Sequence, residues 1–305
     1  MGVVRDKVQM AKHPITYKLY GYPSLLKAGL GNMLFPWADC YLWCKDHEAE
    51  MIAPYWTKLR IGPYLRREKD KRSYQRLFKP QDQVSGFKRL FLLSTVQTCN
   101  YEQFKEHVLL RKNTIVKFTN MECMDRLVGR HEEVKHALIS MTRPEYLPAR
   151  FVEPFIAIHV RLGDYPLPND TSPKWTSRLP IEWYVAALHQ VREVLGGNIN
   201  AIVFSDGLES ELAPLLGMPN VSRSLYTEAI TDILALAQAS VIIGSCSTFS
   251  SWGVYLSGTA STIWYRGRRP ANIFGDEKSA LFEAEWAIGD SLPELFVGIL
   301  KQAMS

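Results

Sequence analysis

Arg161, a side chain that could bind a phosphate, stands at the end of a predicted buried strand, two residues after His159. His159 and Arg161 occur in the stretch FIAIHVRLGD, in which FIAIHV (155–160) is a short apolar run rich in β-forming residues. Side chains two apart on an extended chain point to the same side, so both face one side of the predicted sheet. The fork-shaped guanidinium of an arginine suits a bidentate contact with a phosphate. Asp164 could hold that guanidinium in place; the alternative is an internal ion pair that only staples the loop.

A turn rich in hydroxyl groups follows another predicted strand. The strand SVIIG (240–244) leads into GSCSTFSSWG (244–253), in which five serine or threonine residues come before or within a predicted helix. The N–H groups of a first helical turn point to a region where the helix dipole favours an anion. The hydroxyls of Ser245, Ser247 and Thr248 add further donors. The turn is therefore the strongest candidate phosphate cradle in the sequence, and a capped helix without a ligand is the alternative.

Two further stretches could contribute to the same site. Asp206 comes after INAIVF (199–204), and its carboxylate can accept two donors from the edge of a base or a ribose, or can cap the helix that follows. In the first half, Gly29-Leu30-Gly31-Asn32 precedes a predicted helix. These residues could bring backbone N–H groups close to an anion, or could form only a tight turn.

The elements that must position these residues alternate regularly in the second half of the chain. Strands are predicted over 155–160, 199–204, 240–244 and 262–265, and helices over 181–195, 207–216, 227–239 and 249–256. Strands separated by helices indicate βαβ units and a parallel sheet, which binds ligands at the carboxyl ends of its strands. The first half has uneven periodicity. It predicts a helix over 38–47, and the stretch 139–154, with three prolines, is typical of a linker.

Composition excludes several classes of protein. The 305 residues carry a net charge of +5, which suits an anionic ligand or an anionic membrane surface but is far below the dense basic stripe of a nucleic-acid binder. No run of 18 apolar residues is present, and the first residues lack the apolar core of a signal peptide. Five scattered cysteines are typical of reduced thiols. We expect a cytoplasmic protein, with peripheral contact to the cytoplasmic face of a membrane as an option.

No metal site is predicted. Cys40, Cys44 and His47 share one helix face at i, i+4 and i+7, but zinc takes four ligands and nothing nearby supplies the fourth, so buried structural cysteines are favoured. An Asp-x-Asp triplet, the usual carboxylate clamp for a metal–nucleotide complex, is absent. The basic run RREKDKRSYQRLFK (66–79) is typical of a solvated helix face, with contact to an acidic acceptor or to membrane headgroups as the alternative.

Taken together, these stretches resemble glycosyltransferase family 11, the α-1,2-fucosyltransferases, and more loosely the α-1,6- and protein O-fucosyltransferases. HVRLGDY (159–165) is similar to the family's HxRRxDY motif, and VFSD (203–206) is similar to its second signature. DILALAQASVIIGSCSTFSSWGVYL (232–256) is similar to the third signature, and GLGN (29–32) to the family's N-terminal segment. The resemblance covers roughly 25–45 and 155–265, in the family's order and spacing.

The resemblance implies an α/β fold of GT-B type, with two facing Rossmann-like domains, parallel sheets and a cleft between them. Residues 1–148 would form an N-terminal, acceptor-binding domain and 149–305 a C-terminal domain for the nucleotide-sugar donor. The donor would be GDP-fucose, and transfer to a glycan hydroxyl, such as α-1,2 transfer to galactose, would invert the anomeric centre without a metal or other cofactor. The glycan acceptor could be linked to a lipid at a membrane face.

The resemblance also assigns roles to residues of this chain. His159, Arg161 and Asp164 would form the catalytic group, with Arg161 on the β-phosphate of the donor, where it stabilises the departing GDP. The resemblance does not fix the base: an inverting step needs the acceptor hydroxyl deprotonated, and Asp164, Asp170 and the diphosphate itself are the candidates for accepting its proton. The remaining donor-binding residues would be Asp206 at the guanine edge, Ser247, Thr248 and Phe249 around the phosphates, and Gly29, Gly31 and Asn32 from the other domain.

One departure from the family pattern concerns the donor pocket. Leu162 stands where the family has its second arginine, and Met33 and Pro36 replace two glutamines of the N-terminal segment. A leucine cannot donate a hydrogen bond to a phosphate or a sugar hydroxyl. The departure keeps two alternatives open: a transferase for another nucleotide sugar, and a non-catalytic module that binds a nucleotide sugar or a glycan.

Overall fold

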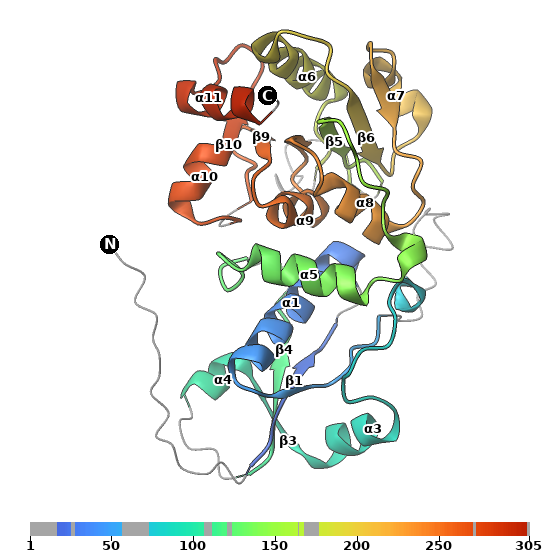
Figure 1. The fold of residues 1–305 in the computed structure, drawn as a ribbon, viewed down its shortest axis with the longest axis vertical. Coiled ribbons are helices and arrows are strands. Elements are labelled where there is room, and N and C mark those ends of the chain that lie inside the picture. The colour runs from blue at the N-terminus through green and yellow to red at the C-terminus, as the bar shows by residue number, and fades with distance from the viewer. Residues whose placement is uncertain are drawn as a thin grey trace.

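Two parallel sheets with helices packed on them make up the described part of the chain (Figure 1). The computed structural model describes residues 17–25, 28–56, 73–106, 112–120, 124–163, 165–167, 177–270 and 273–303. One sheet has four strands in the order β2-β1-β4-β3, and the other has six in the order β10-β9-β8-β5-β6-β7. Every strand pair in both sheets is parallel. The predicted α/β class with parallel sheets is confirmed.

The six-stranded sheet and its helices form the C-terminal lobe, where the predicted elements are found. Strands β5 (Ile156–Val160), β6 (Ala201–Ser205), β8 (Val241–Gly244) and β9 (Ser261–Tyr265) match the four predicted strands. Their helices are α6 (Ile181–Leu195), α7 (Glu209–Leu216), α8 (Ala229–Leu236) and α9 (Thr248–Ser257). Helix α6 ends at Gly196, which takes the left-handed conformation that glycine favours. Strands β7 (Val221–Arg223) and β10 (Glu283–Trp286) and helices α10 (Asp276–Phe282) and α11 (Glu294–Gln302) complete the lobe.

The four-stranded sheet forms the core of the N-terminal lobe, and its strands are short. They are β1 (Leu19–Pro23), β2 (Glu50–Met51), β3 (Gln97–Asn100) and β4 (Thr114–Phe118). The lobe also contains α1 (Leu30–Asp46), α3 (Gly86–Thr95), α4 (Tyr101–Glu106) and the 3-10 turn Gln75–Leu77. Of the basic run 66–79, residues 66–72 lie outside the described residues.

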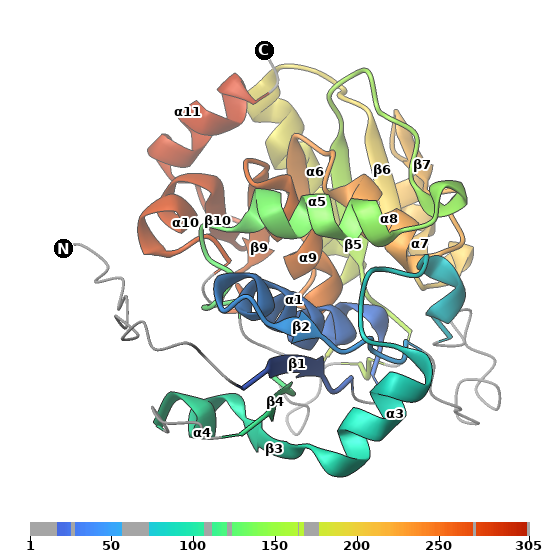
Figure 2. The same ribbon diagram turned by 60° about the horizontal axis from the view of Figure 1, so that its bottom comes forward.

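Helix α1 begins at Leu30, not at Ala38 as predicted, and is buried on nearly all sides. Thirteen of its 17 residues are buried, because it lies between the N-terminal sheet and the other lobe (Figure 2). A helix that is apolar all round has no polar stripe, so the 3.6-residue periodicity that marks a surface helix is weak. This explains why the sequence pattern detected only part of it.

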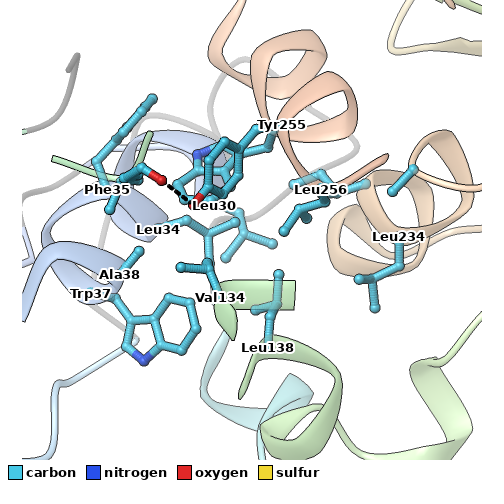
Figure 3. Close-up of a cluster of buried hydrophobic side chains, with 14 of the residues drawn as sticks. Leu30, Leu34, Phe35, Trp37, Ala38, Val134, Leu138, Leu234, Tyr255 and Leu256 are labelled. Atoms are coloured by element: carbon cyan, nitrogen blue, oxygen red, sulfur yellow. Dashed lines mark hydrogen bonds between the residues drawn. The ribbon is translucent and has the colours of Figure 1, made fainter. Parts of the chain in front are cut away.

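A single hydrophobic cluster joins the two lobes. Helix α5 (His131–Met141) lies between them and packs against α9, and the chain then runs through the 3-10 turn Pro144–Tyr146 to β5. Figure 3 shows side chains of α1, α5, α8 and α9 meeting in this cluster, among them Leu34, Val134, Leu234 and Leu256. The two lobes are therefore held together by a shared core. A domain division at residues 148–149 stays a prediction. No helix among the described residues has the length and hydrophobicity needed to cross a membrane.

Candidate active site

The carboxyl ends of four neighbouring strands bring the predicted site residues of the C-terminal lobe together. In the order β9-β8-β5-β6, the strand ends lead to Arg268, to the turn after Gly244, to Arg161 and to Asp206. The hydroxyl-rich turn after β8 thus lies between two arginine-bearing strand ends. The sheet collects cations and backbone N–H groups at one edge, as expected for the ligand-binding edge of a parallel sheet.

Strand β5 separates its side chains strictly by face. Ile158, Val160 and, beyond the strand, Leu162 belong to the hydrophobic cluster that α6 covers. Ala157 belongs to the cluster on the other face, which includes α9, and His159 contacts α9 there. Leu162 is only 6% exposed, and a methyl group added to Gly207 would collide with it. Residue 162 therefore faces the core on the side opposite His159, so its leucine fills a packing position.

Arg161 forms an ion pair with Asp206, across the two neighbouring strands. Oδ1 of Asp206 also accepts hydrogen bonds from the backbone N–H of Leu162 (2.8 Å) and of Gly163 (3.2 Å). The guanidinium of Arg161 lies 5.3 Å from the ring centroid of Tyr165. Among the described residues, Asp206 thus provides an acidic partner for Arg161. Asp164 and Asp170 lie outside the described residues.

The alternative role of Asp206 as a helix cap is wrong. Helix α7 begins at Glu209 with Leu208 as its N-cap residue, and Oε2 of Glu211 accepts the Leu208 N–H at 2.8 Å. The Asp206 side chain instead holds the 161–163 backbone and the Arg161 guanidinium. Its predicted contact with a guanine edge stays a prediction.

His159 ties strand β5 to the hydroxyl-rich turn. Its Nδ1 lies 2.9 Å from Oγ of Ser245 and 2.7 Å from Oγ of Ser250, and its ring stacks on Phe249 at a centroid distance of 5.0 Å. Burial, followed by the charge of Arg161, lowers the pKa of His159 to about 3. The imidazole is therefore neutral at physiological pH and fixes the position of the turn behind it.

Helix α9 begins with a side-chain cap. Oγ of Ser247, the N-cap residue, accepts a hydrogen bond from the backbone N–H of Phe249 at 3.1 Å. The sequence offered a capped helix and a phosphate cradle as alternatives, and the cap is present. A cap satisfies one of the orphan N–H groups of a first turn and leaves the positive end of the helix dipole in place.

The first turns of α1 and α9 meet, although they lie far apart in the sequence. Oγ1 of Thr248 donates to Oδ1 of Asn32 (2.7 Å), a partner 216 residues away, and Nε1 of Trp252 donates to the carbonyl oxygen of Gly31 (2.7 Å). A Cβ on Gly31 would lie 2.7 Å from Oγ1 of Thr248, so any residue larger than glycine would force one of the two helices or the Thr248 side chain to shift. Gly29, the N-cap residue of α1, has open space around it. Two helix amino termini therefore converge at the same place.

Arg268 is a further residue of this edge, and it lies outside the motifs 25–45 and 155–265 that carry the resemblance. It follows β9 and donates to the carbonyl oxygen (3.1 Å) and to Oγ (2.9 Å) of Ser177. Its charge acts to lower the pKa of the Cys246 thiol, although burial is the larger effect and raises that pKa to about 11. The strand-end rule, applied to the predicted strand 262–265, would have found Arg268.

A small hydrogen-bond network holds Gly163 and Tyr165, which follow Arg161. Arg178 donates to the carbonyl oxygens of Tyr165 (2.8 Å) and Gly163 (3.2 Å) and to Oε1 of Glu211 (2.8 Å). The Tyr165 hydroxyl in turn donates to the carbonyl oxygen of Cys246 at 3.3 Å. Tyr165 thereby links the Arg161 strand end to the hydroxyl-rich turn.

The cysteines of α1 are structural. The sulfur atoms of Cys40 and Cys44 lie 4.0 Å apart and are buried against Gly21, and Nδ1 of His47 donates to the carbonyl oxygen of Trp43 at 2.9 Å. Within the residues that the structure describes, no group of three or more His, Cys, Asp or Glu side chains could hold a metal ion.

Comparisons with known proteins place the chain in a family. No curated protein matches the sequence. A structure of NodZ α-1,6-fucosyltransferase soaked with GDP-fucose is similar in fold, with 14% identity and a TM-score of 0.50 over 84% of this chain and 97% of that one. A structure of POFUT1 with GDP-fucose is 13% identical (TM-score 0.45, 85% and 100% covered). A variant of Arabidopsis thaliana FUT1 with GDP is 11% identical (TM-score 0.48, 86% and 73% covered).

The family assignment comes from the sequence itself. The model of the family described as Glycosyl transferase family 11 matches residues 124–289, a span that contains strands β5 to β10 and the edge with Arg161 and Asp206. Because this match covers more than half of the 305 residues, the chain belongs to glycosyl transferase family 11 and is a glycosyltransferase.

Proposed function

We propose that this protein transfers fucose from GDP-fucose to a hydroxyl group of a glycan, with inversion at the anomeric carbon and without a metal ion. The observation that carries the proposal is the convergence of the first turns of α1 and α9 beside the strand end that bears Arg161. Two helix amino termini and a fixed guanidinium create a site for a diphosphate. Solved relatives by fold contain GDP or GDP-fucose, which supports the choice of donor.

The chemistry requires stabilisation of the departing GDP. As the bond between the fucose and the β-phosphate breaks, negative charge develops on the diphosphate. Arg161, held by Asp206, and the dipoles of α1 and α9 supply fixed positive charge there. Arg268, on the other side of the β8–α9 turn, supplies a second cation. Preorganised groups of this kind need no reorganisation at the moment of reaction.

The other predicted residues take supporting roles. His159 positions the phosphate-binding turn through Ser245 and Ser250, and acts as a positioning residue because it is buried and neutral. Asn32 and Gly31 bring the N-terminal lobe to the donor, while Ser247, Thr248 and Phe249 shape the turn. Asp164, Asp170 or the diphosphate takes the proton of the acceptor hydroxyl. We assign residues 149–305 to the donor and residues 1–148 to the acceptor, at a cytoplasmic location.

The burial of Leu162 bears on the two alternatives. These alternatives, a transferase for another nucleotide sugar and a non-catalytic binding module, drew their support from one departure. Leu162 replaces the family's second arginine, at a position assumed to line the donor pocket. Since the Leu162 side chain packs in the cluster under α6, its identity does not change the face that carries Arg161. This favours the fucosyltransferase over a binding module or a transferase for another sugar.

A nucleotide panel followed by a transfer assay tests the proposal. Thermal unfolding with GDP, UDP, ADP and dTDP should show stabilisation by GDP alone. Arg161→Ala should abolish it, whereas Arg76→Ala, which removes an exposed arginine paired with Glu228, should not. GDP-fucose should then be consumed in the presence of EDTA when glycans are supplied. A preference for UDP would overturn the donor assignment, and GDP binding without hydrolysis or transfer would point to a binding module.

A further inference from the structure

The ring of Tyr55 is held in a fixed position shortly after strand β2, and its side chain is 55% exposed. The guanidinium of Arg89, from α3, lies 3.7 Å from the ring centroid, a distance that an atom reaches only from above one face of the ring. Arg89 is buried, and it donates hydrogen bonds to the carbonyl oxygen of Ala53 (2.9 Å) and to the hydroxyl of Tyr22 (3.2 Å). One face of the Tyr55 ring is thus covered by a fixed cation, and the exposed area lies on the rest of the ring.

Tyr55 lies at the carboxyl edge of the N-terminal sheet. Tyr22, which helps to hold Arg89, is the next-to-last residue of β1, and Ala53 comes two residues after β2. Helix α3 packs on one face of this sheet and α1 on the other (Figure 2). From the same edge β1 leads to α1, whose first turn contacts α9 of the other lobe. The edge therefore faces the C-terminal lobe, and the carboxyl edge of a parallel sheet is the usual place for a ligand.

The chain next to Tyr55 is tied to the junction of the two lobes. The N–H of Trp56 donates to Oε1 of Gln75 at 3.2 Å. Arg76, the residue after Gln75, pairs with Glu228 at 2.6 Å. Glu228 belongs to the C-terminal lobe and lies between β7 and α8, and β7 is the neighbour of β6 in the sheet whose carboxyl edge forms the proposed donor site. A short series of contacts thus connects the Tyr55 ring to that donor edge.

An exposed aromatic face at this place is complementary to a sugar ring. A pyranose presents C–H groups on one of its faces, and their small positive charge is attracted to the negative face of an aromatic ring. Ligand sites combine such aromatic surface with a few polar groups that fix orientation, and the Tyr55 hydroxyl is one such group. Because the chain is a glycosyltransferase, its reaction needs an acceptor held beside the donor. An acceptor that rests on the N-terminal lobe and reaches the donor edge has to cross the edge at which Tyr55 lies.

We propose that Tyr55 is a stacking platform for a saccharide acceptor, with Arg89 holding the ring from behind. The ring binds a sugar unit of the acceptor away from the reacting hydroxyl, so Tyr55 is a binding residue and not a catalytic one. The proposal rests on the proposed transfer to a glycan and adds the surface that recognises that glycan. Removal of the ring should therefore weaken the binding of the acceptor and leave the binding of the donor unchanged.

Saccharide binding by the full chain tests this proposal. The probes are lactose, cellobiose and α-1,2-mannobiose, titrated by saturation-transfer NMR in the presence of GDP. Tyr55→Ala should bind the best of these disaccharides about tenfold less well than the unchanged protein, whereas Tyr55→Phe, which keeps the ring, should stay within about threefold. The matched control is Tyr17→Ala, which removes a tyrosine that is 39% exposed just before β1, at the opposite edge of the same sheet, and should bind like the unchanged protein.

Transfer kinetics give a second readout. With the best disaccharide as acceptor, Tyr55→Ala should raise the KM for the acceptor about tenfold, with the affinity for GDP unchanged. Equal saccharide binding by Tyr55→Ala and Tyr17→Ala, or no binding of any disaccharide, would overturn the proposal. A parallel loss of GDP affinity in Tyr55→Ala would also overturn it, because the ring would then act by shaping the fold. Failure of the donor assignment looks different: the unchanged protein would not bind GDP, while its saccharide binding would still depend on Tyr55.

Discussion

The contact between the first turns of α1 and α9 can be broken by a single methyl group. Gly31 lies in the first turn of α1, and its carbonyl oxygen accepts the Trp252 indole N–H. In Gly31→Ala the new Cβ would lie 2.7 Å from Oγ1 of Thr248 and 3.3 Å from the backbone nitrogen of Phe249. The Thr248 hydroxyl could rotate, but the backbone of Phe249 cannot yield without moving the turn. The substitution therefore pushes α1 and α9 apart at the proposed diphosphate site.

The expected cost follows from two opposing effects. Overpacking of this kind costs about 1–3 kcal/mol in the free energy of unfolding. An alanine inside a helix recovers about 0.5–1 kcal/mol relative to glycine. The net destabilisation is then about 0–2.5 kcal/mol. If the same displacement moves the donor groups, the affinity for GDP falls by about tenfold, which corresponds to about 1.4 kcal/mol of binding free energy.

Isothermal titration with GDP and thermal unfolding of the same samples measure both effects. Gly298→Ala is the matched control, because Gly298 lies within α11 and its added Cβ would meet nothing within 4 Å. The control should be as stable as the unchanged protein or slightly more so, with the same affinity for GDP. If Gly31→Ala binds GDP as tightly as the control does, the α1–α9 contact does not shape the donor site and the reasoning is refuted.

Three further predictions concern single residues. Leu162→Arg should lower the free energy of unfolding by about 3 kcal/mol or more, because it places an unpaired charge in the hydrophobic cluster under α6. Leu162→Met should lower it by less than about 1.5 kcal/mol, and denaturant unfolding measures both values. Because the pKa of His159 is lowered in the folded state, His159 stabilises the fold fully above about pH 6.5. As the pH falls from there toward 3, the free energy of unfolding should drop by up to about 1.4 kcal/mol per pH unit. The raised pKa of Asp39, about 6, has the opposite effect: it makes the protein more stable as the pH falls from about 6 to 4. The His159 effect is therefore measured as the difference in unfolding free energy between the unchanged protein and His159→Asn. That difference should be smaller at about pH 5 than at about pH 7. Arg268→Ala should weaken GDP binding by about tenfold or more through loss of a second cation, and an unchanged affinity by titration would remove Arg268 from the donor site.

The C-terminal lobe could be predicted from the sequence because its elements carry strong local patterns. Its strands read as short apolar runs bounded by turn residues, as buried parallel strands do, and α6 has a clear apolar face. The N-terminal strands do not. Strand β1 contains a glycine and a proline, β3 (Gln97–Asn100) is largely polar, and β2 has two residues. Strands β1, β2 and β4 pack against α1, and no local pattern records such a contact.

Individual residues of the site could be predicted from the sequence, but the contacts between them could be found only from the fold. The sequence places Arg161 and Asp206 at two strand ends, and only the adjacency of β5 and β6 shows that they pair. The contact of Asn32 with Thr248 joins elements of the two lobes, which lie beyond the reach of any local pattern. The burial of Leu162 is different. Strand alternation, carried two residues past Val160, already assigns it to the core face of β5.

A crystal structure of this protein with GDP bound would test the proposed diphosphate site. The diphosphate should lie between the first turns of α1 and α9, with its oxygens at hydrogen-bond distance, about 3 Å, from the Arg161 guanidinium. A diphosphate bound elsewhere, with Arg161 paired only to Asp206 and the α1–α9 junction in contact with no ligand, would contradict it.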